Sequence, residues 1–332
     1  MRPGIAWIFA AFAAFVTVAA PAVAQRNAVE SWDPSARDFS RPPSEPGLPA
    51  DQRSATLDNL DKILASPKLS AFDRSIYLSI RAYQLSRLGR QDDSRKDIAE
   101  MGKVLPGEWQ RVLSRTVPEL AGGGDRAAAL RTLDSALLQK PGDSWLMIAQ
   151  AQVHMQLADF GRALVLLDEA LAGSSSAADR RAALFYRGHA HFNLGQYGPA
   201  ADDFDATLAG RPTAAARLAP ALWRYAAQVR ARRDARAPLA RDVGEEAFAE
   251  WPGQIARFLL GRLPAGELEV IAETDEAAKR ANGRCPSAFF IAVDAQRRGD
   301  KQRAREQLQL AQARCPTISE VNWAASSELK RL

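Results

Sequence analysis

Two cysteines are the residues of this sequence whose spacing most clearly favours a covalent link. Cys285 and Cys315 lie 30 positions apart, and each is followed by proline. The stretch between them predicts a helical hairpin, in which the start of the first helix and the end of the second lie side by side. A structural disulfide fits that arrangement. Two free structural thiols or a redox-active pair are the alternatives, although redox centres more often show a Cys-x-x-Cys spacing.

The three histidines do not form a recognisable metal site. His189 and His191 are two positions apart on an expected helix and therefore point to different faces, and no carboxylate or cysteine completes a ligand set with His154. Two cysteines are also too few for a four-thiolate iron–sulfur cluster. We therefore expect no metal and no cofactor, and we interpret the histidines as packing or groove-lining residues.

No catalytic motif stands out. The sequence contains no Gly-x-Ser-x-Gly, no His-Glu-x-x-His and no phosphate loop, and the glycine run 122–124 lacks a following lysine, so it is interpreted as a turn. The sequence therefore favours a protein that is not an enzyme. A cell-wall hydrolase hidden in residues 213–284 is the less favoured alternative.

The composition predicts a folded, all-α protein. The 332 residues are 47% hydrophobic and 25% charged, which excludes wholesale disorder, and strand-forming residues are scarce between long stretches rich in Ala, Leu and Arg. The formal net charge of +5 is mild for this length, and no nucleic-acid partner is expected for a protein whose N-terminus, as described below, predicts export. One local cluster of basic residues could meet an acidic partner, or could be an exposed helix end: Arg230, Arg232, Arg233, Arg236 and Arg241.

The amino terminus predicts export. Residues 1–24 carry a single charge, Arg2, then an apolar core, and then Pro21 before the triplet Ala-Val-Ala. This pattern is typical of a signal peptide cleaved after Ala24, which indicates a periplasmic or secreted protein without a transmembrane segment after cleavage. An uncleaved membrane anchor is the alternative. Residues 25–50 hold five prolines and are expected to be a flexible linker.

A repeated pattern organises the remaining chain. Its clearest copy, residues 184–212, reads as two amphipathic helices around a turn, with Gly188 and Ala200 as small residues inside the helices and Pro212 closing the unit. Equivalent small residues recur at Ala129 and Ala163, at intervals of 34 and 37 residues, and further copies surround Gly89 and Gly299. This pattern resembles the tetratricopeptide repeat (TPR), which implies an α-solenoid of about five helical hairpins.

The repeat divides the chain into three parts. Residues 51–212 are expected to form an N-terminal TPR array, residues 213–284 a divergent helical repeat with an inserted hairpin, and residues 285–332 a C-terminal TPR hairpin with a capping helix. Within the divergent part we expect helices over 219–233, 237–250, 254–263 and 266–281. Helices over 57–64 and 318–329 should cover the ends of the stack. Pro118 predicts a short or kinked helix in the second unit.

The C-terminal half is similar to NlpI-like periplasmic adaptors. The residues that carry this resemblance are Trp251, Pro252, Gly253, Leu260, Gly261, Phe290, Gly299, Asp300, Ala311, Glu320 and Leu329. It implies an adaptor in the cell envelope that binds a protease or a cell-wall hydrolase. No lipid-acceptor cysteine lies near the cleavage point, which departs from the lipid-anchored members. An oligomeric assembly factor for outer-membrane or division machinery is the alternative function.

The TPR resemblance also implies a binding surface. In such proteins the first helix of each hairpin lines a concave groove, and the corresponding positions here are Tyr83, Arg87, Trp145, Ile148, Gln152, Met155, Gln156, Phe185, His189, Phe192 and Asn193. Aromatic rings with amides suit an extended or helical peptide. The alternative is that part of this stripe is inter-helix core. Partner identity and oligomeric state are left open.

Overall fold

The computed structural model describes residues 50–174, 176–209, 213–248 and 251–332. The expected signal peptide (1–24) and nearly all of the expected linker (25–50) lie outside this part of the chain, so both stay predictions. The described residues form helices and no strand, as the composition predicts. None of these helices is both long and apolar enough to cross a bilayer.

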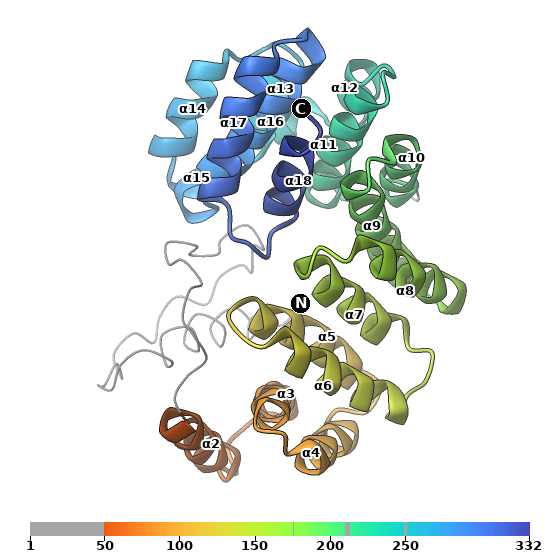
Figure 1. Cartoon of the computed structure of the whole chain (residues 1–332), viewed down its shortest axis with the longest axis vertical. Coiled ribbons are helices and arrows are strands. Elements are labelled where there is room, and N and C mark those ends of the chain that lie inside the picture. The colour runs from red at the N-terminus through yellow and green to blue at the C-terminus, as the bar shows by residue number, and fades with distance from the viewer. Residues whose placement is uncertain (1–49, 175, 210–212, 249–250) are drawn as a thin grey trace.

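Four regular hairpins follow a first helix, α2 (Ala50–Leu64). They are α3 (Ala71–Arg87) with α4 (Gln91–Val104), α5 (Trp109–Gly122) with α6 (Arg126–Gln139), α7 (Ser144–Gln156) with α8 (Phe160–Gly173), and α9 (Ala177–Asn193) with α10 (Tyr197–Thr207). We call α3–α10 the array. Figure 1 shows these hairpins following one another along an arc, with α3, α5, α7 and α9 as consecutive neighbours.

Local signals explain where the array helices begin and end. Asp125, Asp143 and Asp159 accept hydrogen bonds from backbone N–H groups at the starts of α6, α7 and α8. Gly89 and Gly195 adopt positive φ in the turns after α3 and α9, where a side chain would be strained. The repeat pattern therefore placed these turns correctly.

Small residues let the two helices of a hairpin approach closely. Ala129, Ala163 and Ala200 are fully buried on α6, α8 and α10. A Cβ added at Gly188 would lie 2.8 Å from Phe204 Cε1, closer than van der Waals contact allows. The expected role of Gly188 and Ala200 is thus confirmed. Pro118 does not end its helix, because α5 runs through the proline and has 14 residues, against 17 in α3 and 13 in α7; the expectation of a short or kinked helix stays a prediction.

The divergent part contains α11 (Ala214–Arg230), α12 (Arg236–Asp242), the 3-10 turn η1 (Glu245–Phe248), α13 (Gly253–Leu259), α14 (Ala265–Thr274) and α15 (Glu276–Arg280). Two expected helices are interrupted. The one over 237–250 ends at Asp242, because Val243 adopts an extended conformation. The helix expected over 266–281 is interrupted at Asp275, which adopts an extended backbone conformation. The Asp275 side chain accepts a hydrogen bond from the Ala278 N–H and so caps the start of α15.

The C-terminal hairpin consists of α16 (Arg284–Arg298) and α17 (Lys301–Arg314). Cys285 and Cys315 form a disulfide across its open end, with the two Cα atoms 4.9 Å apart. This confirms the structural disulfide, and both cysteines are only 5% exposed. The last helix, α18 (Glu320–Leu329), packs on α16 and α17 and also reaches α9.

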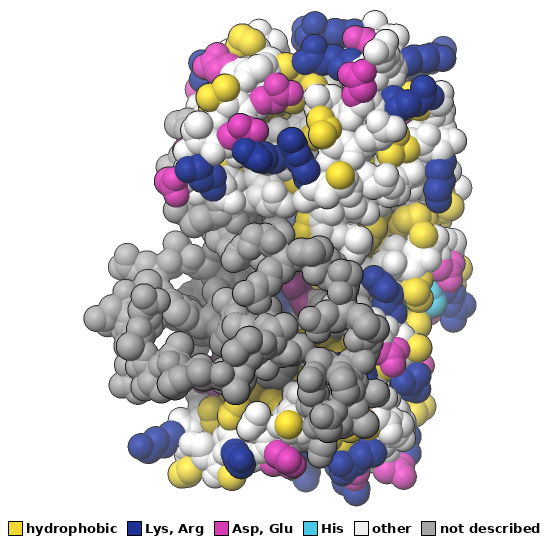
Figure 2. All heavy atoms as spheres, turned by 60° about the vertical axis from the view of Figure 1, so that its left-hand side comes forward, with side chains coloured by type: hydrophobic (Ala, Val, Ile, Leu, Met, Phe, Trp, Pro, Cys, Tyr) yellow, Lys and Arg dark blue, Asp and Glu magenta, His cyan; other side chains and the backbone are white. Residues whose placement is uncertain are grey.

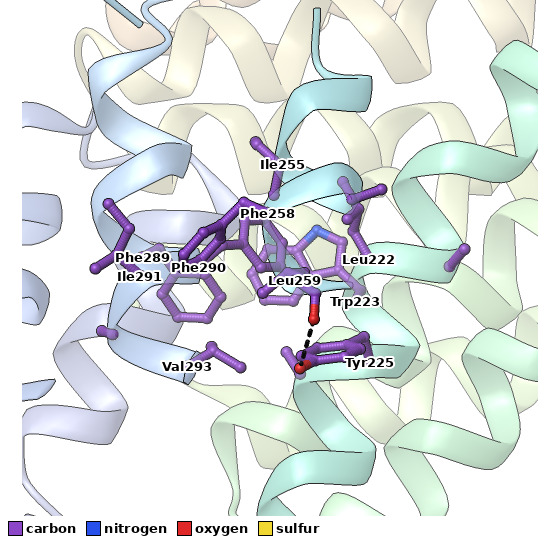
Figure 3. Packing of buried hydrophobic residues seen from close by; sticks show 14 of the residues in the cluster. Leu222, Trp223, Tyr225, Ile255, Phe258, Leu259, Phe289, Phe290, Ile291 and Val293 are labelled. Atoms are coloured by element: carbon purple, nitrogen blue, oxygen red, sulfur yellow. Dashed lines mark hydrogen bonds between the residues drawn. The ribbon is translucent and has the colours of Figure 1, made fainter. Parts of the chain in front are cut away.

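The largest hydrophobic core joins α9–α18 and is rich in aromatic rings. Trp223 of α11 lies 5.0 Å from Phe289 of α16, and Phe289 lies 5.2 Å from Phe290, measured between ring centroids. Figure 3 shows these rings converging with Phe258 of α13, while the Tyr225 hydroxyl donates to the Leu259 carbonyl. The divergent repeat and the C-terminal hairpin therefore share one core.

Candidate peptide-binding surface

The first helices α3, α5, α7 and α9 pack side by side and form what we call the inner face. Of the eleven residues expected to line its groove, five are partly exposed: Arg87, Trp145, Gln152, Gln156 and Phe185. The other six are at most 3% exposed: Tyr83, Ile148, Met155, His189, Phe192 and Asn193. In this conformation those six contribute to packing between helices.

Tyr83 shows why a predicted groove position can be buried. Its hydroxyl donates to the Leu120 carbonyl at 3.2 Å and accepts from the Asp125 N–H at 3.0 Å. Burial raises the pKa of Tyr83 to about 12, so the phenol stays protonated. Tyr83 therefore ties α3 to the turn between α5 and α6.

His189 is enclosed by aromatic rings. The rings of Phe185, Phe204 and Trp223 lie edge-on to the imidazole, with centroids 4.6, 5.1 and 4.4 Å away. Neither ring nitrogen has a hydrogen-bond partner, and burial lowers the pKa of His189 to about 3. A neutral, enclosed imidazole is a packing residue, so of the two expected roles of His189, packing or groove lining, the structure shows the first.

His154 and His191 instead lie at the turns of their hairpins. His154 Nδ1 is 3.2 Å from Asp159, and His191 Nδ1 is 2.5 Å from the Gln196 side chain. Across the described ranges, no group of three His, Cys, Asp or Glu residues could hold a metal ion.

The exposed part of the inner face combines rings with amides. The Arg111 guanidinium lies 5.2 Å from the Trp145 ring, and Phe185 packs edge-on against Tyr186 at 5.7 Å. Gln156 donates its amide to the Pro118 carbonyl at 2.8 Å. Such a surface supplies apolar contact area and polar groups able to pair with a peptide backbone.

A segment of the chain itself crosses the inner face. We call residues 317–331 the strap. Its Ile318 fills the space beside Gly122 at the end of α5, where an added Cβ would collide with it. Its Trp323 packs in one hydrophobic cluster with Ile148 and Met155 of α7. The strap therefore contacts α5 and α9 and shares a hydrophobic cluster with α7, since Ser327 also donates to the Asn193 side chain of α9 at 2.8 Å.

A buried carboxylate holds the far end of the strap. Glu328 is 1% exposed and lies 2.5 Å from Arg230 Nε. It accepts hydrogen bonds from Tyr197 at 2.5 Å and from Gln296 at 3.0 Å. Arg331 also donates to the Asn193 carbonyl. A terminal helix over 318–329 was expected from the sequence, but its contacts with α9 and the cluster it shares with α7 were not, because partners more than 100 residues away leave no local pattern.

A second feature missed at the sequence level is a set of arginine bridges. Arg81 of α3 bonds both oxygens of Asp97 on α4, at 2.8 and 2.7 Å, and Asp61 on α2, at 2.5 Å. These charge-assisted bonds raise the pKa of Arg81. Each such arginine joins three consecutive helices.

The same bridge recurs in the fourth hairpin. Arg187 of α9 bonds both oxygens of Asp203 on α10, at 2.9 and 2.6 Å, and Asp168 on α8, at 2.8 Å. Arg224, fully buried on α11, contacts Asp205 and Asp242 in the corresponding way. The signal was present in the sequence: an aspartate follows Arg81 and Arg187 by 16 positions and another precedes them by 20 or 19.

The basic cluster over 230–241 is largely neutralised within the molecule. Arg230 pairs with Glu328, Arg233 with Asp202 and Arg241 with Asp242. Arg236 donates to the Leu259 carbonyl. Elsewhere on the surface, Figure 2 shows Lys and Arg side chains beside Asp and Glu side chains on the described part of another face. The cluster therefore serves mainly contacts between helices.

Comparison with known proteins gives partial matches to solved structures. One is a protein from Parabacteroides merdae, with 16% identity and a TM-score of 0.42, over 76% of this chain and 99% of that one. Another is the C-terminal part of a protein from Cytophaga hutchinsonii, with 13% identity and a TM-score of 0.34, over 82% of this chain and 93% of that one. Both are tetratricopeptide repeat proteins. No family model and no curated protein sequence matches the chain.

Proposed function

We propose that this chain is an exported, non-enzymatic scaffold that binds a protein or peptide partner on its inner face. The observation that carries the proposal is the side-by-side packing of α3, α5, α7 and α9, together with the partial exposure of Trp145, Gln152 and Phe185 on α7 and α9. Partly exposed aromatic residues next to amides are typical of peptide-recognition surfaces.

The partner class and the compartment extend this proposal. The signal-like pattern of residues 1–24 supports export, and the resemblance of the C-terminal half to periplasmic adaptors supports an envelope protease or a cell-wall hydrolase as partner. Export is tested separately by mass spectrometry, with a mature N-terminus at Gln25 in the envelope fraction as the expected result. An intact Met1 in that fraction would contradict cleavage.

Crosslinking pull-down from the envelope fraction tests the binding surface. The test variant is Trp145→Ala/Phe185→Ala, which removes two partly exposed rings of the inner face. The control variant is Leu138→Ala/Val165→Ala, which truncates side chains that are 75% and 45% exposed on the second helices α6 and α8. We expect the test variant to lose a captured partner that the control retains. Equal capture by both variants would place the interface elsewhere.

A further inference from the structure

We propose that the strap is an internal ligand of the inner face, which a partner helix of matching chemistry displaces. This inference rests on the proposed function, since it assumes that the inner face binds a partner. It goes beyond that function by naming what occupies the face in the unbound chain and what the partner must present.

The path of the strap supports this assignment. In a solenoid each hairpin normally contacts only its neighbours. The strap instead crosses from Gly122 on α5, past Ile148 and Met155 on α7, to Asn193 on α9. Three of these, Met155, Asn193 and Ile148, are among the residues whose repeat positions predicted a groove. The strap therefore lies where a ligand of those hairpins would lie.

The contacts of the strap with the array are of the kind that a peptide ligand makes. Trp323 supplies one aromatic anchor that is 7% exposed, and Glu328 supplies one carboxylate. The Asn193 side chain accepts from Ser327, and its backbone carbonyl accepts from Arg331. A large ring in a desolvated site surrounded by polar contacts is the usual composition of a binding hot spot.

Three features of the strap and its surroundings favour reversible release. Its helix has only 10 residues, which is too short to be stable in water without its neighbours. Arg230, the cation outside the strap that pairs with Glu328, keeps 24% of its side chain exposed, so water can replace the carboxylate there. The disulfide at Cys315 fixes the chain just before the strap, which keeps a released strap close to its site.

This chemistry defines the displacing partner. It is a short helix with an indole and, five positions later, a carboxylate, as Trp323 and Glu328 are placed in α18. The indole would enter the cluster with Ile148 and Met155, and the carboxylate would pair with Arg230.

A synthetic peptide of the strap's own sequence, residues 317–332 with a fluorescent label, tests the proposal on the full chain. The loosened variant is Ser327→Ala/Glu328→Gln, which removes the hydrogen bond to Asn193 and the charge facing Arg230 while keeping side-chain volume nearly constant. We expect the peptide to bind this variant at least tenfold more tightly than the unaltered chain. A matched peptide with Trp323→Ala should bind at least tenfold more weakly.

Hydrogen exchange separates release from unfolding. The loosened variant should show faster exchange in α18 and unchanged protection in α9 and α16. Unchanged protection of α18 would overturn the proposal, as would equal peptide affinity for the variant and the unaltered chain, or binding that ignores the loss of Trp323. The envelope pull-down is independent of this result, because a partner can be captured by the exposed residues Trp145 and Phe185 even if the strap never leaves.

Discussion

The array and the C-terminal part are both built from helices, but they are held together differently. In the array, the same arginine bridge joins three helices at Arg81 and again at Arg187, and a buried alanine recurs on α6, α8 and α10. Beyond Arg224 of α11, which carries a bridge of this kind across the boundary, the part up to α18 depends mainly on contacts that occur once, namely the rings around Trp223 and Phe289 and the disulfide of Cys285 with Cys315.

This difference predicts which part of the molecule tolerates substitutions with the smaller loss of stability. A contact that recurs along the array is one of several similar contributions to stability. Its loss therefore weakens the packing between neighbouring hairpins at one place only. A contact that occurs once has no equivalent elsewhere, and the shared core of α9–α18 depends on it. We therefore expect the largest effects in the C-terminal part.

The largest expected effect follows from truncating a ring of the shared core. Phe289 is fully buried, so Phe289→Ala should lower the free energy of unfolding by about 3–5 kcal/mol through lost burial and an unfilled cavity. Urea unfolding followed by circular dichroism measures it. A loss below about 1 kcal/mol would mean that the two regions do not differ as described.

Removing the disulfide should have the next largest effect. The bond closes a loop of 30 residues, and the double variant Cys285→Ala/Cys315→Ala should lower the free energy of unfolding by about 3–4 kcal/mol in the chain-entropy view. The same urea titration, on samples of equal helix content before denaturation, gives the value. Unchanged stability would indicate that the shared core alone fixes the C-terminal hairpin.

An arginine bridge should contribute less. Arg187→Met leaves the carboxylate of Asp203, which is 8% exposed, without its main partner. The expected loss is about 2 kcal/mol, below the 3–5 kcal/mol of a fully buried pair, because the Arg187 side chain is 26% exposed.

Two control variants sharpen that measurement. The neutral pair Arg187→Gln/Asp203→Asn should recover part of the loss, since no buried charge is left alone. Arg233→Met, which removes an exposed partner of Asp202, should change stability by at most about 0.5 kcal/mol. Similar losses for Arg187→Met and Arg233→Met would remove the distinction between bridge and surface pair.

The smallest expected effect is a pH dependence of the free energy of unfolding that arises from His189. This residue lies on α9, where the array meets the shared core. Its pKa is lowered to about 3 in the folded chain from an ordinary value of about 6.5, so below pH 6.5 the unfolded chain binds a proton that the folded chain does not. The stabilisation that the neutral His189 provides is therefore fully present well above pH 6.5 and is lost as the pH decreases toward 3. Between pH 7.5 and 5.5 the loss is about 1.4 kcal/mol.

Denaturant unfolding of the unaltered chain and of His189→Phe at both pH values measures this contribution. The phenylalanine variant should lack about 1.4 kcal/mol of the pH-dependent loss, since it cannot take up the proton. An identical pH dependence in the two proteins would show that His189 is accessible to protons in the folded state.

Much of the fold could be predicted from the sequence because its signals are local. Gly89 and Gly195 mark turns, small residues such as Ala163 mark close helix contacts, and the proline-flanked cysteines mark the open end of one hairpin. The positions at which helices are interrupted were harder to predict. Nothing in the periodicity of 237–250 shows that Val243 adopts an extended conformation.

The candidate site could be predicted only in part, because burial depends on what packs against a helix from outside. Trp145 and Phe185 were placed on a surface and are partly exposed. Met155 and Asn193 were placed on the same surface but are covered, and their neighbours include Trp323 and Ser327 of the strap. The arginine bridges were predictable in principle, since the spacing between Arg187 and Asp203 repeats that between Arg81 and Asp97.

The strap also has a consequence for the order of folding. Its bonds to the array join residues 131 to 138 positions apart, whereas helices within a hairpin join near neighbours in the chain. Contacts over such long loops form late, because the entropy of closing the loop opposes them. During synthesis the strap is also made after everything it contacts. A newly folded array therefore passes through a period with an uncovered inner face, in which the chain is most exposed to association with other molecules.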